Sequence, residues 1–332
     1  MKKILIYFIM ILFLVSGCGK YSETDVVGDL NKKINKLNSY RLTGVLELVN
    51  NDNVYNYDVD VSYKKGDFYK VKLTNLSNEH TQIILKNEDG VFVLTPSLNK
   101  SFKFQSDWPY SNSQIYLLSA LLNDINSDEN RKYKEIDDGY VFSTSVNYPN
   151  NKKLVGQRIE LDKDLNLKRV KVFDENDIAY MTMEVNDIDY SPTFKNDYFD
   201  LDTVMSTCSI DCQFVEETTN IEDTIYPLVL PTGTKLISEE KVKTSSGERV
   251  IMTFDGDKPF LLVEETINVS DEFTIIPTYG EPYRLMDTLG VMTNNSLTWT
   301  SNGVEYYIIS DVLEQDELIE IAQSINVLPT MK

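Results

Sequence analysis

The chain has one histidine, His80, which limits the chemistry that its side chains can perform. A Ser-His-Asp or Cys-His nucleophile, and any metal site built on several histidines, would each depend on that residue alone. His80 follows Glu79 in a segment whose composition predicts a β-strand, where a histidine is typical of a sheet surface or edge. The Gly-x-Ser-x-Gly, His-Glu-x-x-His and phosphate-binding-loop motifs do not occur in the sequence. We therefore predict no catalytic residue, no metal ion and no cofactor.

Three other spacings imitate known sites without the residues that those sites require. Residues 62–65 and 97–100 both read Ser-x-x-Lys, but both fall at the ends of predicted strands. Penicillin-binding chemistry needs this motif at the start of a helix, with Ser-Asp-Asn and Lys-Thr-Gly elsewhere. Residues 162–166 begin like a calcium loop, yet Leu167 stands where glycine is needed and Phe173 where glutamate is needed. We interpret the first two as chance and the third as a polar turn.

Cys208 and Cys212 form an isolated pair with three residues between them. Two thiolates without a nearby histidine are poor zinc ligands, and redox pairs usually have a two-residue spacer. We favour a structural disulfide, which persists in an oxidising compartment, over metal binding and thiol exchange.

The first twenty residues have the layout of a secretory signal. Two lysines precede an unbroken apolar run, Ile4–Val15, that is short for a membrane-spanning helix. Residues 15–18, Val-Ser-Gly-Cys, look like a bacterial lipobox. This likeness implies that Cys18 carries a diacylglycerol and palmitate and becomes the first residue of the mature chain. We predict a signal peptide over 1–17 and attachment to the extracytoplasmic face of the cell membrane through Cys18. The alternatives are an ordinary cleaved signal and an uncleaved anchor.

The composition is strongly acidic. The 332 residues include 52 Asp and Glu against 32 Lys and Arg, a formal net charge of −20. Such a surface repels the phosphates of nucleic acid and anionic lipid, so we predict no nucleic-acid partner and no membrane contact beyond the anchor. The chain is 42% hydrophobic and has 20 tyrosines, which suits amphipathic strands around a substantial core.

The periodicity of apolar residues predicts the elements that position these groups. Residues 18–40 are predicted to form a tether and a helix, because apolar residues repeat there at three- and four-residue steps. The period then changes to two, which is typical of an antiparallel sheet with one wet and one dry face. A helix over 113–125 and an acidic loop over 128–138 are followed by further strands, giving a domain over 41–200.

The dry face of this sheet and the apolar side of the helix over 113–125 would enclose a cavity for an apolar ligand. The alternative is that the helix fills the same space as an ordinary core. The candidate cavity residues are Tyr55, Tyr57, Val59, Val61, Tyr63, Tyr69, Val71, Leu73, Leu118, Leu121 and Leu122.

The end of the chain is predicted to form a smaller domain. Residues 201–226, which contain both cysteines of the isolated pair, lose periodicity and are assigned to a linker. A domain over 227–332 would then end in a helix capped by Asp311 and Glu314. Its first strands are expected near 235–243, 248–255, 259–269 and 273–276. The predicted fold class is α+β, a curved antiparallel sheet with covering helices followed by a small α+β domain.

Two segments resemble the lipoprotein-carrier superfamily of the bacterial envelope, which includes LolA and the RseB/MucB sensors. They are the hairpin Tyr63–Val71 and the segment Asp107–Ile125. The tail from Leu297 to Ile325 resembles the small domain that follows the carrier-like domain in sporulation-associated lipoproteins of Gram-positive bacteria. The combined pattern is most similar to the YdcC/GerS-like sporulation lipoproteins of Gram-positive bacteria. The resemblance implies a LolA-like half-barrel, whose interior holds acyl chains in carrier-like relatives. One YdcC/GerS-like member is an accessory partner of a cortex-lytic amidase.

Together these features predict a non-enzymatic, membrane-anchored extracytoplasmic lipoprotein. It would bind an apolar ligand, a lipoprotein or a protein partner in the cell envelope, with a role linked to sporulation or germination. The alternative is a cell-wall or glycan hydrolase that uses acidic residues.

Overall fold

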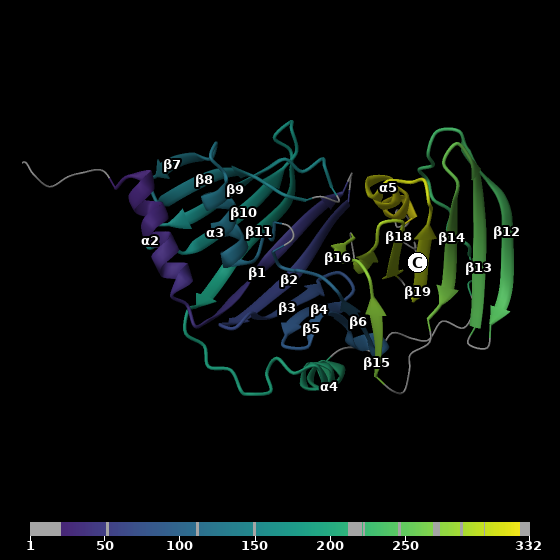
Figure 1. The fold of residues 1–332 in the computed structure, drawn as a ribbon, viewed down its shortest axis with the longest axis horizontal. Helices are drawn as coiled ribbons and strands as arrows, with labels where there is room; N and C mark the ends of the chain where they lie inside the picture. Colours follow the sequence, from purple (N-terminus) through teal and green to yellow (C-terminus); the bar gives the residue numbers. More distant parts are fainter. Residues whose placement is uncertain are drawn as a thin grey trace, which may run out of the picture.

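The computed structural model describes residues 21–50, 53–110, 113–148, 151–211, 221, 223–244, 247–267, 273–285, 288–301 and 303–325. The predicted signal peptide over 1–17, Cys18 and Cys212 lie outside these ranges. Two sheets stand side by side along the longest axis of the molecule, with helices packed against them (Figure 1). The predicted α+β fold class is confirmed.

Helix α2 (Glu23–Asn35) forms within the predicted range 18–40 and lies at one end of the long axis (Figure 1). The Ser22 side chain accepts a hydrogen bond from the Asp25 N–H, and the Asp25 carboxylate accepts one from the Ser22 N–H. This reciprocal capping box satisfies amide groups that the first helical turn leaves unpaired. The buried Val26 and Leu30 attach the helix to the core of the larger sheet.

The larger sheet has twelve strands in the order β15-β6-β5-β4-β3-β2-β1-β11-β10-β9-β8-β7. Every pairing is antiparallel except β15 with β6. Its strands are β1 (Ser39–Asn50), β2 (Asn53–Lys64), β3 (Phe68–Asn75), β4 (Thr81–Asn87), β5 (Gly90–Thr95), β6 (Lys100–Phe104), β7 (Lys132–Ile136), β8 (Gly139–Ser145), β9 (Gly156–Asp162), β10 (Leu167–Phe173), β11 (Ala179–Asp189) and β15 (Thr274–Thr278).

Two local predictions in this region are wrong. The helix expected over 113–125 is α3 (Leu118–Ser127) and starts five residues later. The residue at its expected start, Ser113, is not helical, because its N–H donates to the Asn147 carbonyl and its hydroxyl accepts from the Asn147 N–H. The expected acidic loop over 128–138 contains β7, which pairs with β8 along its whole length. Cross-strand pairing there overrides the low strand propensity of a charged segment.

The expectation of one wet face fails at β4 and β5. Ile84 packs into the main core, whereas Ile83 and Leu85 point to the opposite face and are also buried. They are covered by Val204 and Met205 of α4 (Leu201–Asp211), a helix that forms where an aperiodic linker was expected. These strands are buried on both faces because the chain returns over the sheet.

The smaller sheet has seven strands in the order β12-β13-β14-β19-β18-β17-β16. Helix α5 (Gln315–Ile325) covers one face, where Leu318 and Ile321 meet Trp299 and other core residues. The Glu314 N–H donates to the Glu317 carboxylate, so the cap is Glu314 with Glu317 and not Asp311 with Glu314. The strands are β12 (Thr234–Thr244), β13 (Gly247–Gly256), β14 (Phe260–Thr266), β16 (Glu281–Arg284), β17 (Leu289–Met292), β18 (Ser296–Ser301) and β19 (Val304–Ile309).

Strand β15 joins the two sheets. It leaves the smaller sheet after β14 and pairs in parallel with β6 at the edge of the larger sheet (Figure 1). The buried Gln82 side chain on β4 adds a second connection. Its Nε2 donates to the Leu289 carbonyl at 3.2 Å, and its Oε1 accepts from the Leu289 N–H. The side-chain amide therefore pairs with a backbone peptide group as a strand would.

Candidate functional site

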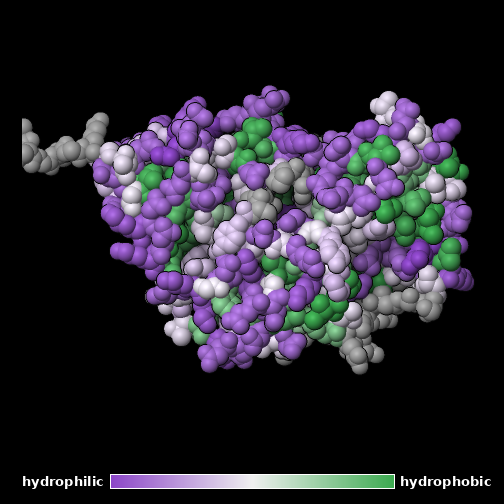
Figure 2. All heavy atoms as spheres, viewed as in Figure 1, coloured by the Kyte–Doolittle hydropathy of each residue, from purple (hydrophilic) through white to green (hydrophobic). Residues whose placement is uncertain are grey.

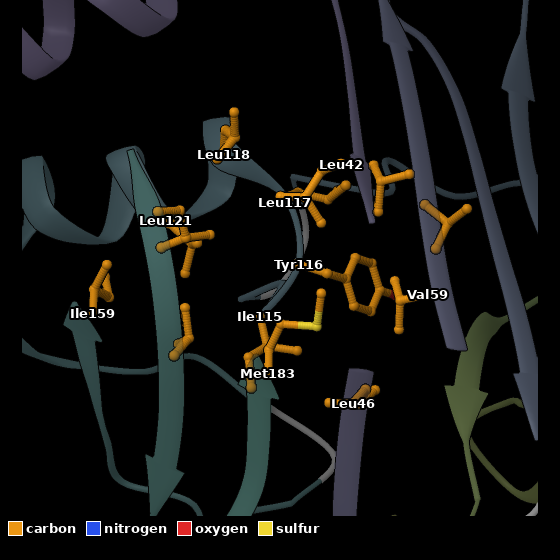
Figure 3. Close-up of a cluster of buried hydrophobic side chains, with 14 of the residues drawn as sticks. Leu42, Leu46, Val59, Ile115, Tyr116, Leu117, Leu118, Leu121, Ile159 and Met183 are labelled. Carbon is orange, nitrogen blue, oxygen red and sulfur yellow. The ribbon is translucent and has the colours of Figure 1, made fainter. Parts of the chain in front are cut away.

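The eleven candidate cavity residues come together between the larger sheet and α3. All but Tyr55 and Tyr63 are buried, and those two pack against the same cluster. Figure 3 shows Tyr116, from the segment before α3, lying beside Val59, with Leu118 and Leu121 on the helix. The strand and helix side chains belong to one buried cluster, and the Tyr69 hydroxyl on β3 lies 3.2 Å from the Ser119 hydroxyl on α3.

The cavity found beside this core is small. Its volume is ≈ 20 Å³, which holds about one water molecule. Leu118, Leu121 and Leu122 line it together with side chains of α2, β9 and β10, whereas the candidate residues of β2 and β3 do not. Drug-sized ligands need about 300 Å³ or more, so an acyl chain would require α3 to move. A cavity for acyl chains remains a prediction.

The predicted cysteine chemistry also remains a prediction. Cys208 belongs to α4, and its proposed disulfide partner Cys212 lies outside the described residues, as does Cys18. Among the described residues, no group of three or more His, Cys, Asp and Glu side chains could hold a metal ion. No helix of the described chain is long and apolar enough to cross a membrane.

His80 is enclosed at the turn between β3 and β4. Burial lowers its pKa, and its Nε2 atom has no hydrogen-bond partner within the described ranges. An imidazole used as a catalytic base is normally oriented by a hydrogen bond to its second nitrogen. His80 therefore fits a structural position, but it is enclosed in the turn before β4 and not at the strand surface or edge that was predicted.

A groove lies on the outer face of the smaller sheet, opposite α5. It has a volume of ≈ 410 Å³, and its apolar floor is formed by Ile251, Val263 and Tyr307. These three residues stand directly opposite one another across β13, β14 and β19.

Two carboxylates in this groove raise the possibility of glycosidase chemistry. Glu265 and Glu305 are direct cross-strand neighbours. Glu265 accepts hydrogen bonds from Arg249 at 2.7 and 2.9 Å, and Lys100 lies 3.1 Å from Glu305. A glycosidase needs one carboxyl group that holds a proton as general acid, whereas each of these has its own cation.

The carboxyl group with a strongly raised pKa lies on the other face of β14. Burial raises the pKa of Glu264 to about 7, while a hydrogen bond from the Ile225 N–H at 3.0 Å opposes the shift. Successive side chains of a strand point to opposite faces, so Glu264 faces the core and Glu265 the groove. The proton-holding carboxyl and the groove are therefore separated by the sheet.

Exposed apolar side chains are concentrated in a different part of the smaller domain. Eight of the 17 exposed large hydrophobic residues among the described ranges lie between residues 226 and 261. We call this set the β12 surface, and it consists of Tyr226, Leu228, Val229, Leu230, Leu236, Ile237, Val242 and Leu261. Figure 2 shows apolar residues gathered at the end of the molecule that carries β12. The set includes both faces of the smaller sheet, because Leu236 lies opposite the core residue Phe254 and Leu261 lies on the outer face. Apolar side chains gathered at one end of a molecule are typical of protein-binding sites. Sequence reasoning missed it, although the run Tyr-Pro-Leu-Val-Leu at 226–230 was a visible signal.

Comparison with known proteins gives one close relative. No model of a protein family matches the chain. The chain is 34% identical over 331 residues to sporulation protein YdcC of Bacillus subtilis (strain 168), covering 98% of both chains. The chain belongs to the YdcC family. The YdcC/GerS-like resemblance seen in the sequence is thereby confirmed for YdcC.

Solved structures with similarity to this YdcC-family chain have lower identity. Pseudomonas aeruginosa MucB, solved with MucA, is 12% identical, with a TM-score of 0.31, over 89% of this chain and 98% of that one. The complex of the CwlD amidase with the GerS lipoprotein from Clostridioides difficile gives 20% identity and a TM-score of 0.32, over 53% of this chain and 100% of that one. A LolA superfamily protein from Nitrosomonas europaea gives 10% identity and a TM-score of 0.32, over 54% and 98%.

Proposed function

We propose that this protein is a non-enzymatic lipoprotein that Cys18 holds at the extracytoplasmic face of the membrane, where it binds a protein partner. The observation that carries this proposal is the contrast between two apolar surfaces. The candidate cavity residues belong to one buried cluster beside a cavity of ≈ 20 Å³, whereas the β12 surface is exposed. A buried cluster of this kind beside an exposed apolar surface favours a protein partner over an acyl chain.

The position of the two ends of the molecule supports the same proposal. The described chain starts beside α2 at one end of the long axis, and β12 forms the opposite end (Figure 1). A lipid on Cys18 would thus fix one end and leave the β12 surface accessible. Membership of the YdcC family suggests that this binding serves sporulation. We retain 41–200 and 227–332 as the proposed domains, joined by 201–226.

The test is purification of the native protein from its own membranes, with identification of the proteins and lipids that accompany it. We expect an envelope protein at near-equal amount and no glycan turnover.

Cys18→Ala should release the protein from the membrane while leaving its circular dichroism unchanged, because a lipid anchor contributes nothing to the folded core. Cys208→Ala is the matched control and should stay attached. Firm attachment of the Cys18→Ala variant would refute the anchor. Glycan turnover without any accompanying protein would refute the binding function.

A further inference from the structure

We propose that the free edge of β12 binds an extended, cationic segment of the partner protein, which adds to the smaller sheet as an eighth strand. This inference rests on the proposed function, because it states where and how the partner binds.

The backbone of β12 selects an extended polypeptide. β12 is the last strand of its sheet and pairs only with β13. A bulge between Leu236 and Ser238 interrupts the pairing, and regular register runs from Ser238 to Thr244. The free side of such a strand presents unpaired N–H and C=O groups. Another strand satisfies these groups most completely, as in recognition by strand addition.

The side chains of the edge offer apolar contacts on the outer face. Val242, opposite Arg249, is 42% exposed, and Ile237 in the bulge is 54% exposed. An added strand would place alternate side chains against this row, next to the apolar floor of the groove. Leu236 stands opposite Phe254 and gives a smaller apolar contact on the core face.

The charge of the smaller domain and one position of the edge favour a cation. β12 itself has three lysines against two glutamates, but residues 221–332 contain 19 Asp and Glu against 7 Lys and Arg, which is −12 of the total −20. At the centre of the edge, Glu240 is exposed, and none of the ion pairs in the described ranges includes it. Its neighbour Lys241 is neutralised by Glu248 at 2.8 Å. An arginine or lysine opposite Glu240 would form the missing cross-strand pair.

The same charges disfavour a second copy of the chain. Two copies related by a two-fold axis perpendicular to the sheet must place one residue of β12 opposite itself. Near the middle of the strand this residue is Glu239, Glu240 or Lys241, and each choice brings like charges together.

The experiment uses the mature chain with Cys18→Ala and defined peptides. The probe is the seven-residue peptide Thr-Val-Thr-Arg-Thr-Val-Thr, which places one arginine and two valines on the same face, as Glu240 and Val242 require. Hydrogen exchange is followed by mass spectrometry at low salt. We expect the peptide to protect amides of residues 234–244 and no other strand. The same peptide N-methylated at alternate residues should give no protection, because it cannot form the ladder. A glutamate-for-arginine peptide should also give none.

Two protein variants distinguish binding at the β12 edge from a general effect of the net charge of the protein. Glu240→Lys should weaken peptide binding roughly tenfold, since it replaces attraction by repulsion at the paired position. Glu175→Lys makes the same charge change in an exposed turn after β10 and should weaken binding only slightly.

Four results would overturn the proposal. The first is an absence of protection of the amides of residues 234–244, and the second is equal weakening of peptide binding by Glu240→Lys and Glu175→Lys. The third is flotation of the protein with phosphatidylcholine vesicles that Val242→Lys abolishes. The fourth is a dimer of the protein in sedimentation that Glu240→Lys disrupts. If the native partner still co-purifies with the Glu240→Lys variant, the edge assignment fails while the binding function stands.

Discussion

At the scale of single residues, Glu264 contributes to how stability depends on pH. Burial raises the pKa of its carboxyl group to about 7, from 4.5 for a free glutamate. The folded state therefore keeps a proton that the unfolded state releases above pH 4.5. Its contribution to stability is fully present below pH 4.5 and is lost as the pH rises to about 7.

We predict that Glu264→Gln flattens this dependence. The glutamine keeps an acceptor for the Ile225 N–H and carries no charge. In wild type, the free energy of unfolding should fall by roughly 2–3 kcal/mol more between pH 5 and pH 7.5 than in the variant. Urea unfolding at both pH values measures this difference, and near-equal stability at pH 5 is the internal control. An identical pH slope in both proteins would contradict the assignment.

At the scale of elements, the periodicity of apolar residues predicted the strands and the helix that bury only one face. The half-buried β1, β2 and β3 alternate as expected, and the helix that became α2 has a narrow apolar stripe and a local cap. The sequence did not reveal that α4 covers the outer face of β4 and β5, since this depends on residues more than one hundred positions apart. The β12 surface was missed for a related reason. Apolar side chains on a strand suggest burial, and only the topology shows that β12 is an edge.

Helix α3 provides the prediction that separates a filled core from a ligand cavity. Leu121 is 3% exposed and borders the small cavity, so Leu121→Ala should cost about 2–5 kcal/mol. The control Asn123→Ala, at an exposed position of the same helix, should stay within about 0.5 kcal/mol. Thermal unfolding with and without a fatty acid provides the measurement. The fatty acid should leave the melting temperatures of both Leu121→Ala and wild type unchanged, because a cavity enlarged by one side chain remains too small for an acyl chain. Stabilisation of wild type would restore the acyl-chain interpretation.

At the scale of the whole molecule, the buried amide of Gln82 makes the two sheets depend on each other. Gln82→Ala would leave the Leu289 N–H without its partner in a buried site, while the Leu289 carbonyl keeps the Thr288 hydroxyl at 3.4 Å. We expect a loss of about 1–3 kcal/mol, because one unsatisfied buried group costs about that much. Calorimetry should show one transition in wild type and a lower melting temperature in the variant. Gln105→Ala, at an exposed position after β6, should change little. Equal effects of the two substitutions would show that the contact adds no stability.

The parallel pairing of β15 with β6 has a consequence for synthesis and export. Thr274 pairs with Lys100, 174 positions earlier in the chain (274 − 100). While the chain emerges, β6 therefore remains an open strand edge until nearly all of the protein is available, and open edges invite aggregation. A product truncated before residue 273 would contain the other eleven strands of the larger sheet and still expose this edge. Such fragments should be removed by envelope proteases, so that full-length chains predominate at the membrane.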